Sequence, residues 1–178
     1  YAWRGAARRL LGAERFRERG YRTAAFTTNV FLQPGLGFER GFEVYSNPKS
    51  RWDGDSAASL TREALAWAGD EARGRGPFFL WVHYLDPHWT YTPEARFARA
   101  ADPAWDGPFD LFERVSRAEV SKGQVVFEAP RVLAPREIEH VRRLYDGEVL
   151  GTDDAVGALL AGLARLGIDR DAVLLVTA

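Results

Sequence analysis

Apolar positions recur along the chain with two periods, one typical of helices and one typical of buried strands. Helical spacing predicts helices from about Ala6 to Arg19, from Asp55 or Ser56 to near Gly74, and from Pro135 to Gly167. Short apolar or β-branched runs predict strands over Thr23–Thr28, Phe78–His83 and Ala172–Thr177. Because strands and helices alternate, we expect an α/β fold with a mostly parallel sheet flanked by helices.

Two details of this pattern bear on the sheet and the last helix. The unbroken apolar run Phe78–His83 predicts a central strand that is covered on both faces. Gly20 and Gly167 follow the first and last helices, at a position where glycine commonly ends a helix. Gly147 and Gly151 fall inside the last helix, and a break near either one is compatible with the pattern.

The stretch of about 92–134 has several prolines and no regular period, so we expect an irregular insertion. Loops of this length commonly carry function. The rest of the composition is that of an ordinary globular domain, with 178 residues, 46% hydrophobic and 28% charged. A formal net charge of -1 argues against a nucleic-acid partner. The chain has no cysteine, which excludes disulfides and thiolate sites, and no apolar run long enough to span a membrane.

Polar side chains capable of chemistry gather directly after the strand Phe78–His83. His83, Asp86 and His88 lie within six positions, at the carboxyl end of the strand, where open α/β sheets place their ligand crevices. Pro87 restricts the turn that carries His88, so we expect His88 to face the crevice in a defined direction. His83 can be a reactive group or a hydrogen-bonded structural histidine, and Asp86 can cap the turn.

Other polar residues have weaker patterns. Asn29 ends the first strand at the same sheet edge, where it can contact a ligand or form a turn. His140 lies on the last helix at a position that we expect to be solvated and inert. Four carboxylates on this helix can bind a cation or form a solvated face, and they are Asp146, Glu148, Asp153 and Asp154.

Five segments, in this order, resemble the sulfatases of the alkaline-phosphatase-like superfamily. The segments are Gly20–Phe26, Gly37–Tyr45, Phe78–Tyr91, Tyr145–Gly157 and Leu174–Ala178. Asp86-Pro87-His88 and the closing Val176-Thr177-Ala178 carry the resemblance most strongly. We therefore interpret residues 1–178 as the central part of a sulfatase-type catalytic domain, with an alkaline-phosphatase-like but incomplete fold.

The resemblance implies a hydrolase of sulfate esters, either small molecules or glycans, that uses a divalent cation, usually calcium. It also implies a formylglycine nucleophile that lies outside this chain, together with most of the metal ligands. The histidine that matches His88 contacts the sulfate and assists the leaving group, so the resemblance makes His88 the catalytic residue. His88, His83 and Asn29 are the expected substrate contacts, and no residue of the chain is assigned to the metal.

One departure from the family keeps other functions open. Many arylsulfatases have Gly-Lys-Trp-His where this chain has Thr27-Thr28-Asn29-Val30, so the family's lysine and histidine are missing. A phosphodiesterase or phosphonate hydrolase of the same superfamily fits this change, and so does a non-catalytic sulfatase-like binding module. Asn29 can also act as a substitute contact. Export is common among such enzymes, so a periplasmic or secreted location is compatible with the resemblance, and the fragment alone is expected to be inactive.

Overall fold

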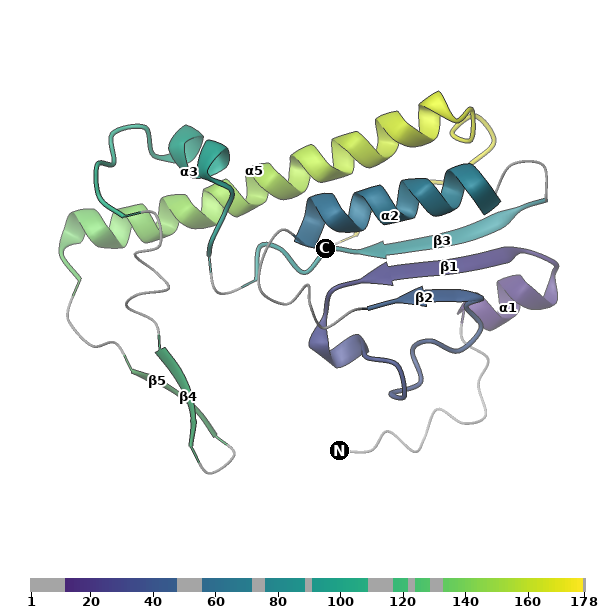
Figure 1. The fold of residues 1–178 in the computed structure, drawn as a ribbon, viewed down its shortest axis with the longest axis horizontal. Coiled ribbons are helices and arrows are strands. Elements are labelled where there is room, and N and C mark those ends of the chain that lie inside the picture. The colour runs from purple at the N-terminus through teal and green to yellow at the C-terminus, as the bar shows by residue number, and fades with distance from the viewer. Residues whose placement is uncertain are drawn as a thin grey trace. The chain divides into compact units, whose positions relative to one another are not determined.

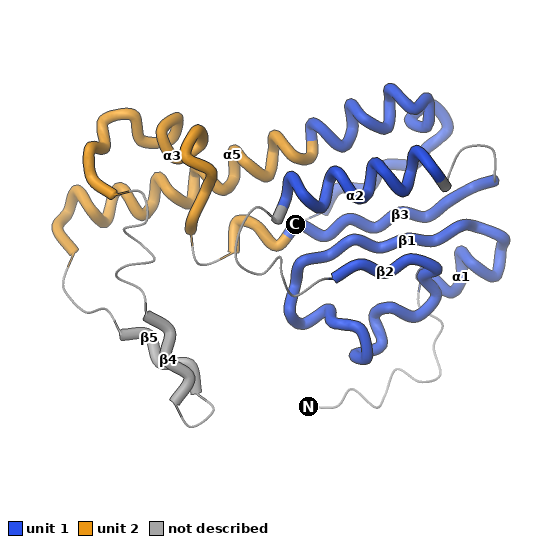
Figure 2. The backbone as a smooth tube through the Cα atoms, in the orientation of Figure 1, with its two compact units in different colours: residues 1–84, 157–178 blue, residues 85–156 orange. Residues whose placement is uncertain are grey.

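The computed structural model of the chain describes residues 12–47, 56–71, 76–88, 91–108, 117–121, 124–128 and 133–177. These residues divide into two compact units, one of residues 1–84 and 157–178 and one of residues 85–156 (Figure 2). We call them unit 1 and unit 2. The helix α5, Pro135–Arg165, runs through both units.

Unit 1 is built on a parallel sheet of three strands, in the order β2-β1-β3 (Figure 1). The strands are β1 (Arg22–Thr27), β2 (Val44–Ser46) and β3 (Phe78–His83). The register pairs Thr27 at the end of β1 with His83 at the end of β3. All three carboxyl ends therefore meet at one edge of the sheet.

One face of the sheet packs on α2 (Ser56–Glu71) and on the last turns of α5. Apolar side chains recur along α2 at helical spacing, which gives the helix a continuous buried stripe. The buried core consists of Ala24, Phe26, Leu60, Ala64, Trp67 and Ala68. Leu159 and Leu163 of α5 pack against this core from the C-terminal part of the unit.

The opposite face of the sheet carries stacked aromatic rings. Phe79 on β3 stacks on Phe16 of α1 (Gly12–Glu18), with ring centroids 4.5 Å apart. Phe42 lies 5.8 Å from Phe79 and 6.0 Å from Trp81, again in stacked arrangements. Both faces of β3 are therefore packed, because alternate side chains of a strand point to opposite faces.

The ends of α1 and α5 confirm the stops predicted at Gly20 and Gly167. Both glycines have positive φ, +80° and +71°. The amide of Gly167 bonds the carbonyl of Ala164, and the amide of Ile168 bonds that of Leu163, which is the Schellman arrangement. The start of α5 is closed by Glu137, whose Oε2 accepts the backbone N–H of Ala134 at 2.8 Å. The helix runs without a break through its internal glycines.

The structure differs from the predicted sheet in three places. β1 is the middle strand, and β3, which was expected to be central, pairs only with β1 among the described residues. An apolar run indicates that both faces of a strand are covered. It does not indicate whether the strand lies in the middle or at the edge of the sheet. The short strand β2 lies in a region predicted as loop, and residues 172–177 form no strand although their pattern is apolar. A strand also needs a hydrogen-bonded neighbour, which the pattern alone does not supply.

Unit 2 contains α3 (Ala95–Ala101), the antiparallel pair β4 (Arg117–Ser121) and β5 (Gln124–Glu128), and the first turns of α5. The stretch 92–134, expected to be irregular, thus includes one helix and a hairpin. Short elements of this kind have too few residues to show a clear period. The first helix was predicted from about Ala6, but residues 1–11 lie outside the described part of the chain, as does Asp55.

A close backbone approach at Gly41 gives the first prediction. Gly41 has φ +85°, and a Cβ there would lie 2.2 Å from the backbone nitrogen of Glu14. We expect Gly41→Ala to lower the free energy of unfolding by about 2 kcal/mol, because it adds overpacking to an unfavourable φ.

The control for this prediction is Gly35→Ala. Gly35 has φ +94°, but a Cβ at this position would meet nothing within 4 Å. We therefore expect only the conformational cost of about 1 kcal/mol. Chemical denaturation of the full-length protein measures both variants, and equal losses would contradict the packing argument.

Candidate functional site

Asn29 and His83 lie at the same edge of the sheet in unit 1. Thr27 and His83 are paired residues at the ends of β1 and β3, and Asn29 follows Thr27 by two positions. The prediction that these two residues share the carboxyl edge is based on parallel strands running in one direction, and the register agrees with it. This is the edge at which an open α/β sheet binds its ligands.

Polar atoms without a protein partner gather at this edge. His83 Nδ1, Thr28 Oγ1 and Asn47 Oδ1 are buried and have no hydrogen-bond partner within the described ranges. Asn47 directly follows β2, and Ser46 of β2 pairs with Phe26 of β1, so all three atoms belong to the same end of the sheet. Buried polar atoms normally have a hydrogen-bond partner. Buried atoms that lack one in the described ranges, gathered at one sheet edge, are typical of a site that a ligand or water completes.

Asn29 is held in place from two sides. Its Oδ1 accepts the backbone N–H of Phe31 at 2.9 Å and caps the short helix η1, Val30–Leu32. Its carbonyl oxygen accepts a hydrogen bond of 2.8 Å from Nδ2 of Asn47. The side-chain oxygen of Asn29 thus forms the turn, and its Nδ2 remains the group that can donate to a ligand.

Tyr45 fixes the same loop from β2. Its hydroxyl donates a 2.6 Å hydrogen bond to the carbonyl of Leu32. Burial raises the pKa of Tyr45 to about 12, and the negative charge of Glu39 contributes in the same direction. The hydroxyl therefore stays protonated at neutral pH and acts as a permanent donor that holds the loop after β1.

His88 lies in unit 2, in the turn Leu85–His88. The backbone N–H of His88 donates to the carbonyl of Leu85 at 3.0 Å, and the peptide bond between Asp86 and Pro87 is cis. His88 is exposed, so its ring is accessible to a substrate. Asn29 and His83 belong to unit 1, so the crevice that the sequence predicts for all three residues stays a prediction.

The segment that follows His88 packs on a single stretch of α5 in unit 2. We call Tyr91–Phe97 the docking segment and Tyr145–Gly151 the docking turn. The rings of Tyr91 and Tyr145 meet edge to face, with centroids 5.4 Å apart. Residues Trp89 and Thr90, which join His88 to the docking segment, lie outside the described residues.

The two glycines of the docking turn allow a close approach. A Cβ at Gly147 would lie 2.9 Å from Cγ of Pro93, and one at Gly151 would lie 3.3 Å from the ring of Phe97. Glycine at these positions therefore admits the docking segment to the helix surface, although it lowers helix propensity. The break that the pattern allowed near these glycines is absent, and the segment packed on them supports the helix there.

Glu148 completes the docking turn and is half-buried beneath the docking segment. Its Oε1 accepts the backbone N–H of Thr92 at 2.6 Å. Burial raises the pKa of Glu148 to about 7, and the charge of Asp86 contributes to the rise, while the hydrogen bond from Thr92 opposes it. The sequence places Glu148 among four carboxylates of equal standing, and only the structure separates it from the other three.

His140 is buried, which corrects the expectation of a solvated position. Its Nδ1 lies 2.8 Å from Oδ2 of Asp102, and the ring of Trp105 stacks on it at 3.9 Å. Arg136, one turn before His140, donates to both oxygens of Asp102 at 2.8 and 2.6 Å. The spacing of Arg136 and His140 places them on one helix face, but the residues that cover this face come from a distant segment.

The charge of this cluster is set by Arg136. Its hydrogen bonds hold the pKa of Asp102 below the usual range, and His140 adds to this effect. Asp102 is therefore ionised at neutral pH, although its side chain is only 8% exposed. The cluster ties the end of α3 to α5, and a role in holding the fold of unit 2 explains it fully.

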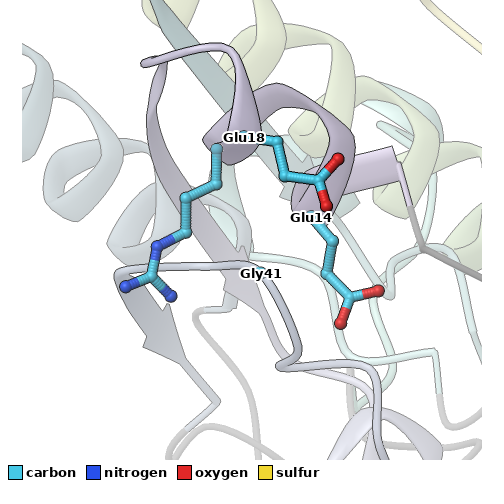
Figure 3. A pocket seen from close by; sticks show the side chains of 4 residues that line it. Glu14, Glu18 and Gly41 are labelled. Atoms are coloured by element: carbon cyan, nitrogen blue, oxygen red, sulfur yellow. The ribbon is translucent and has the colours of Figure 1, made fainter.

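A surface depression lies on α1, away from the predicted site. Glu14, Arg17, Glu18 and Gly41 line it, and Figure 3 shows both labelled carboxylates beside the backbone of Gly41. The carbonyl of Gly41 accepts the hydroxyl of Thr23, near the start of β1. The depression is therefore at the amino edge of the sheet, where an open α/β sheet does not bind its ligands.

The described residues do not form a metal site of this chain's own. Nowhere in the described ranges do three His, Cys, Asp or Glu side chains come together as a ligand set. We therefore assign no metal ligand to the described residues, and the chemistry below is derived from their own side chains. No helix in the described part of the chain has the length and apolar character that crossing a bilayer requires.

Comparison with known proteins adds a family and a fold. A family model described as "Sulfatase" matches residues 13–178. A solved structure with a TM-score of 0.54 and 19% identity is described as "Metabolism of multiple glycosaminoglycans by bacteroides thetaiotaomicron is orchestrated by a versatile core genetic locus (BT33494S-sulf)". The match covers 89% of this chain and 39% of that one, so this chain spans less than half of its length. No curated protein gives a significant match.

Proposed function

Because the chain belongs to the sulfatase family, we propose that the full-length protein is a hydrolase that cleaves sulfate esters. The match over residues 13–178 carries this proposal, since it covers both units. The exposed His88 supports it, and so do the buried polar atoms at the carboxyl edge of the sheet that lack a partner in the described ranges. On this proposal, residues outside this chain supply the nucleophile, which is a formylglycine. Residues outside this chain also supply the ligands of a divalent cation, calcium.

In this proposal His88 is the catalytic residue that assists the leaving group. As the ester S–O bond breaks, negative charge grows on the bridging oxygen, and the alcohol leaves once that oxygen gains a proton. An imidazolium at residue 88 can donate this proton, because its ring N–H is a general acid. The exposure of His88 agrees with a group that meets a substrate arriving from solvent.

Asn29 and His83 are the proposed substrate contacts at the sheet edge. Nδ2 of Asn29 can donate to a sulfate oxygen, and Oδ1 of the same residue keeps the amide oriented through Phe31. Nδ1 of His83 is buried without a partner in the described part of the chain, so a bound polar group would satisfy it. Both contacts are hydrogen bonds, which agrees with the absence of the family's lysine from Thr27–Val30.

For the substrate we propose a sulfate ester of a glycan or a small molecule. The name of the similar solved structure refers to the metabolism of multiple glycosaminoglycans, which supports the glycan. A phosphodiester is the competing substrate, because the residues Thr27–Val30 depart from the arylsulfatase pattern and leave room for it. The two substrates differ in charge distribution and in the geometry of the reacting centre.

The test compares two chromogenic substrates on the full-length protein. We expect kcat/KM for 4-nitrophenyl sulfate to exceed that for bis(4-nitrophenyl) phosphate by about tenfold or more, because the site is built for one geometry of the transferred group. The reverse order would contradict the proposal in favour of a phosphodiesterase. Turnover of neither substrate by the metal-loaded protein would favour a non-catalytic binding module.

A further inference from the structure

The chain that follows the turn carrying His88 is tied to α5. Beyond His88, the backbone N–H of Thr92 donates to Oε1 of Glu148 at 2.6 Å. Before His88, the negative charge of Asp86 raises the pKa of the same carboxyl group, which disfavours its ionised form. Glu148 therefore holds the chain on the C-terminal side of His88, and Asp86, His88, Thr92 and Glu148 all belong to unit 2.

The hydrogen bond to Thr92 is part of a continuous packed contact. Pro93 and Tyr91, the neighbours of Thr92, lie against Gly147 and Tyr145 of the docking turn. Three consecutive residues of the docking segment thus meet one turn of α5. A contact of this kind defines the path of the chain much more tightly than a single surface hydrogen bond does.

We propose that Glu148 is a positioning residue for His88, because it holds the backbone at Thr92, four residues beyond the imidazole. The proposal depends on the proposed function only in giving His88 a substrate to meet. Glu148 itself acts through the backbone of Thr92. Its protonation state sets how firmly the docking segment is held.

The charged groups around Glu148 favour its protonated form. Asp86, from the turn Leu85–His88, is the charged group that acts on it. Arg96, from the docking segment, is bonded instead to Glu94 and to Asp154 of α5. On α5 itself, Tyr145 faces Tyr91, and Asp146 accepts a hydrogen bond from a neighbouring arginine. The described surroundings therefore offer Glu148 no cation that would lower its pKa.

The sign of the pH effect follows from the raised pKa. The pKa of Glu148 is about 7 when the segment is docked and returns towards its ordinary value of 4.5 when it is released. The released state therefore binds fewer protons between pH 4.5 and 7, and docking weakens as the pH rises through this window. Above pH 7 the loss of docking free energy caused by the ionisation of Glu148 is complete. The equilibrium constant for release should rise by up to about 10²-fold between pH 5 and pH 8.

Amide hydrogen exchange of Thr92 in the full-length protein tests the proposal without any substrate. After correction for intrinsic exchange, we expect protection of Thr92 to fall from pH 5 to pH 8 in the wild type. Glu148→Gln keeps an acceptor oxygen but cannot ionise, so its protection should not depend on pH. Glu148→Ala lacks the acceptor and should lose protection about tenfold or more at pH 5.

Turnover of an aryl sulfate then tests the link to His88. Both wild type and Glu148→Gln keep the imidazole of His88, so the fall in kcat from pH 5 to pH 8 should be larger in the wild type, where ionisation of Glu148 also releases the docking segment. At pH 6 kcat of Glu148→Ala should be at least about tenfold below that of the wild type, whereas Glu148→Gln should keep most of the wild-type kcat. If exchange behaves as expected but no sulfate ester is hydrolysed, the positioning of the turn stands and the proposed function fails.

Two glycine variants separate docking from a general loss of stability. Gly147→Ala should push Pro93 away and raise exchange at Thr92 while Glu148 is intact. Gly157→Ala is the matched control, because its Cβ would meet nothing within 4 Å. Wild-type protection of Thr92 in Glu148→Ala, or a protection of Thr92 in Glu148→Gln that depends on pH as in the wild type, would overturn the proposal.

Discussion

Replacing His88 with alanine in the full-length protein should lower kcat for phenyl sulfate by about 10²-fold or more, which is the usual effect of removing a general acid. Phenol is a poor leaving group, so the bridging oxygen needs a proton as the ester bond breaks. The loss should appear in kcat and not mainly in KM, since the proton is needed only in the transition state. Steady-state kinetics with phenyl sulfate measures both.

His88→Gln and Arg142→Ala are the controls for this result. A glutamine at residue 88 can donate a hydrogen bond but no proton, so we expect only a small part of the activity to return. Arg142 is a strongly exposed side chain on α5, and its removal should leave turnover unchanged. Because His88 is exposed, its replacement should also leave the melting temperature nearly unchanged. Wild-type kcat in His88→Ala would reject the catalytic role.

Replacing Asp102 with alanine should lower the free energy of unfolding by about 3 kcal/mol at pH 7, because it leaves the buried His140 and the guanidinium of Arg136 without their carboxylate. Asp102 is 8% exposed and receives bonds from both residues. Chemical denaturation of the full-length protein measures the loss, and Asp154→Ala is the matched control. Asp154 pairs with Arg96 on the surface, where both side chains are more than half exposed, so we expect a loss of about 1 kcal/mol or less.

The effect of Asp102 should also depend on pH in a defined direction. Its pKa is lowered in the folded protein, mainly by hydrogen bonds from Arg136. The stabilisation is therefore fully present above the ordinary value of 3.8 and is lost as the pH falls through the lower folded value. The difference between wild type and Asp102→Ala should shrink in strong acid. A difference that stays constant down to pH 2 would contradict the role of the ionised carboxylate.

Local pattern was sufficient to predict most elements of the sheet and the helices. The apolar runs indicated β1 and β3, and helical spacing indicated α2 and α5. The glycine stops at residues 20 and 167 are confirmed, because positive φ at a helix end is a local requirement. The short strand β2 and the unpaired segment 172–177 were predicted wrongly, since strand formation depends on neighbours that are distant in sequence.

In the candidate site, too, local features could be predicted from the sequence, and features that depend on distant segments could not. Residues 29 and 83 could be assigned to one edge, because parallel strands that begin together also end together. The roles of Glu148 and His140 could not be predicted, because each depends on one contact with a segment more than thirty positions away. In both cases the helix pattern marks the residue as polar, and burial by the partner segment decides what it does.

The central claim is that His88 gives a proton to the leaving group, and the dependence of its loss on the leaving group tests this most directly. The measurement is kcat/KM of wild type and His88→Ala for aryl sulfates whose phenols have pKa values from about 7 to about 10. We predict a small deficit for the most acidic phenol and a deficit that grows steadily, towards about 10²-fold, as the phenol becomes more basic. A deficit of the same size for every phenol would contradict proton donation by His88.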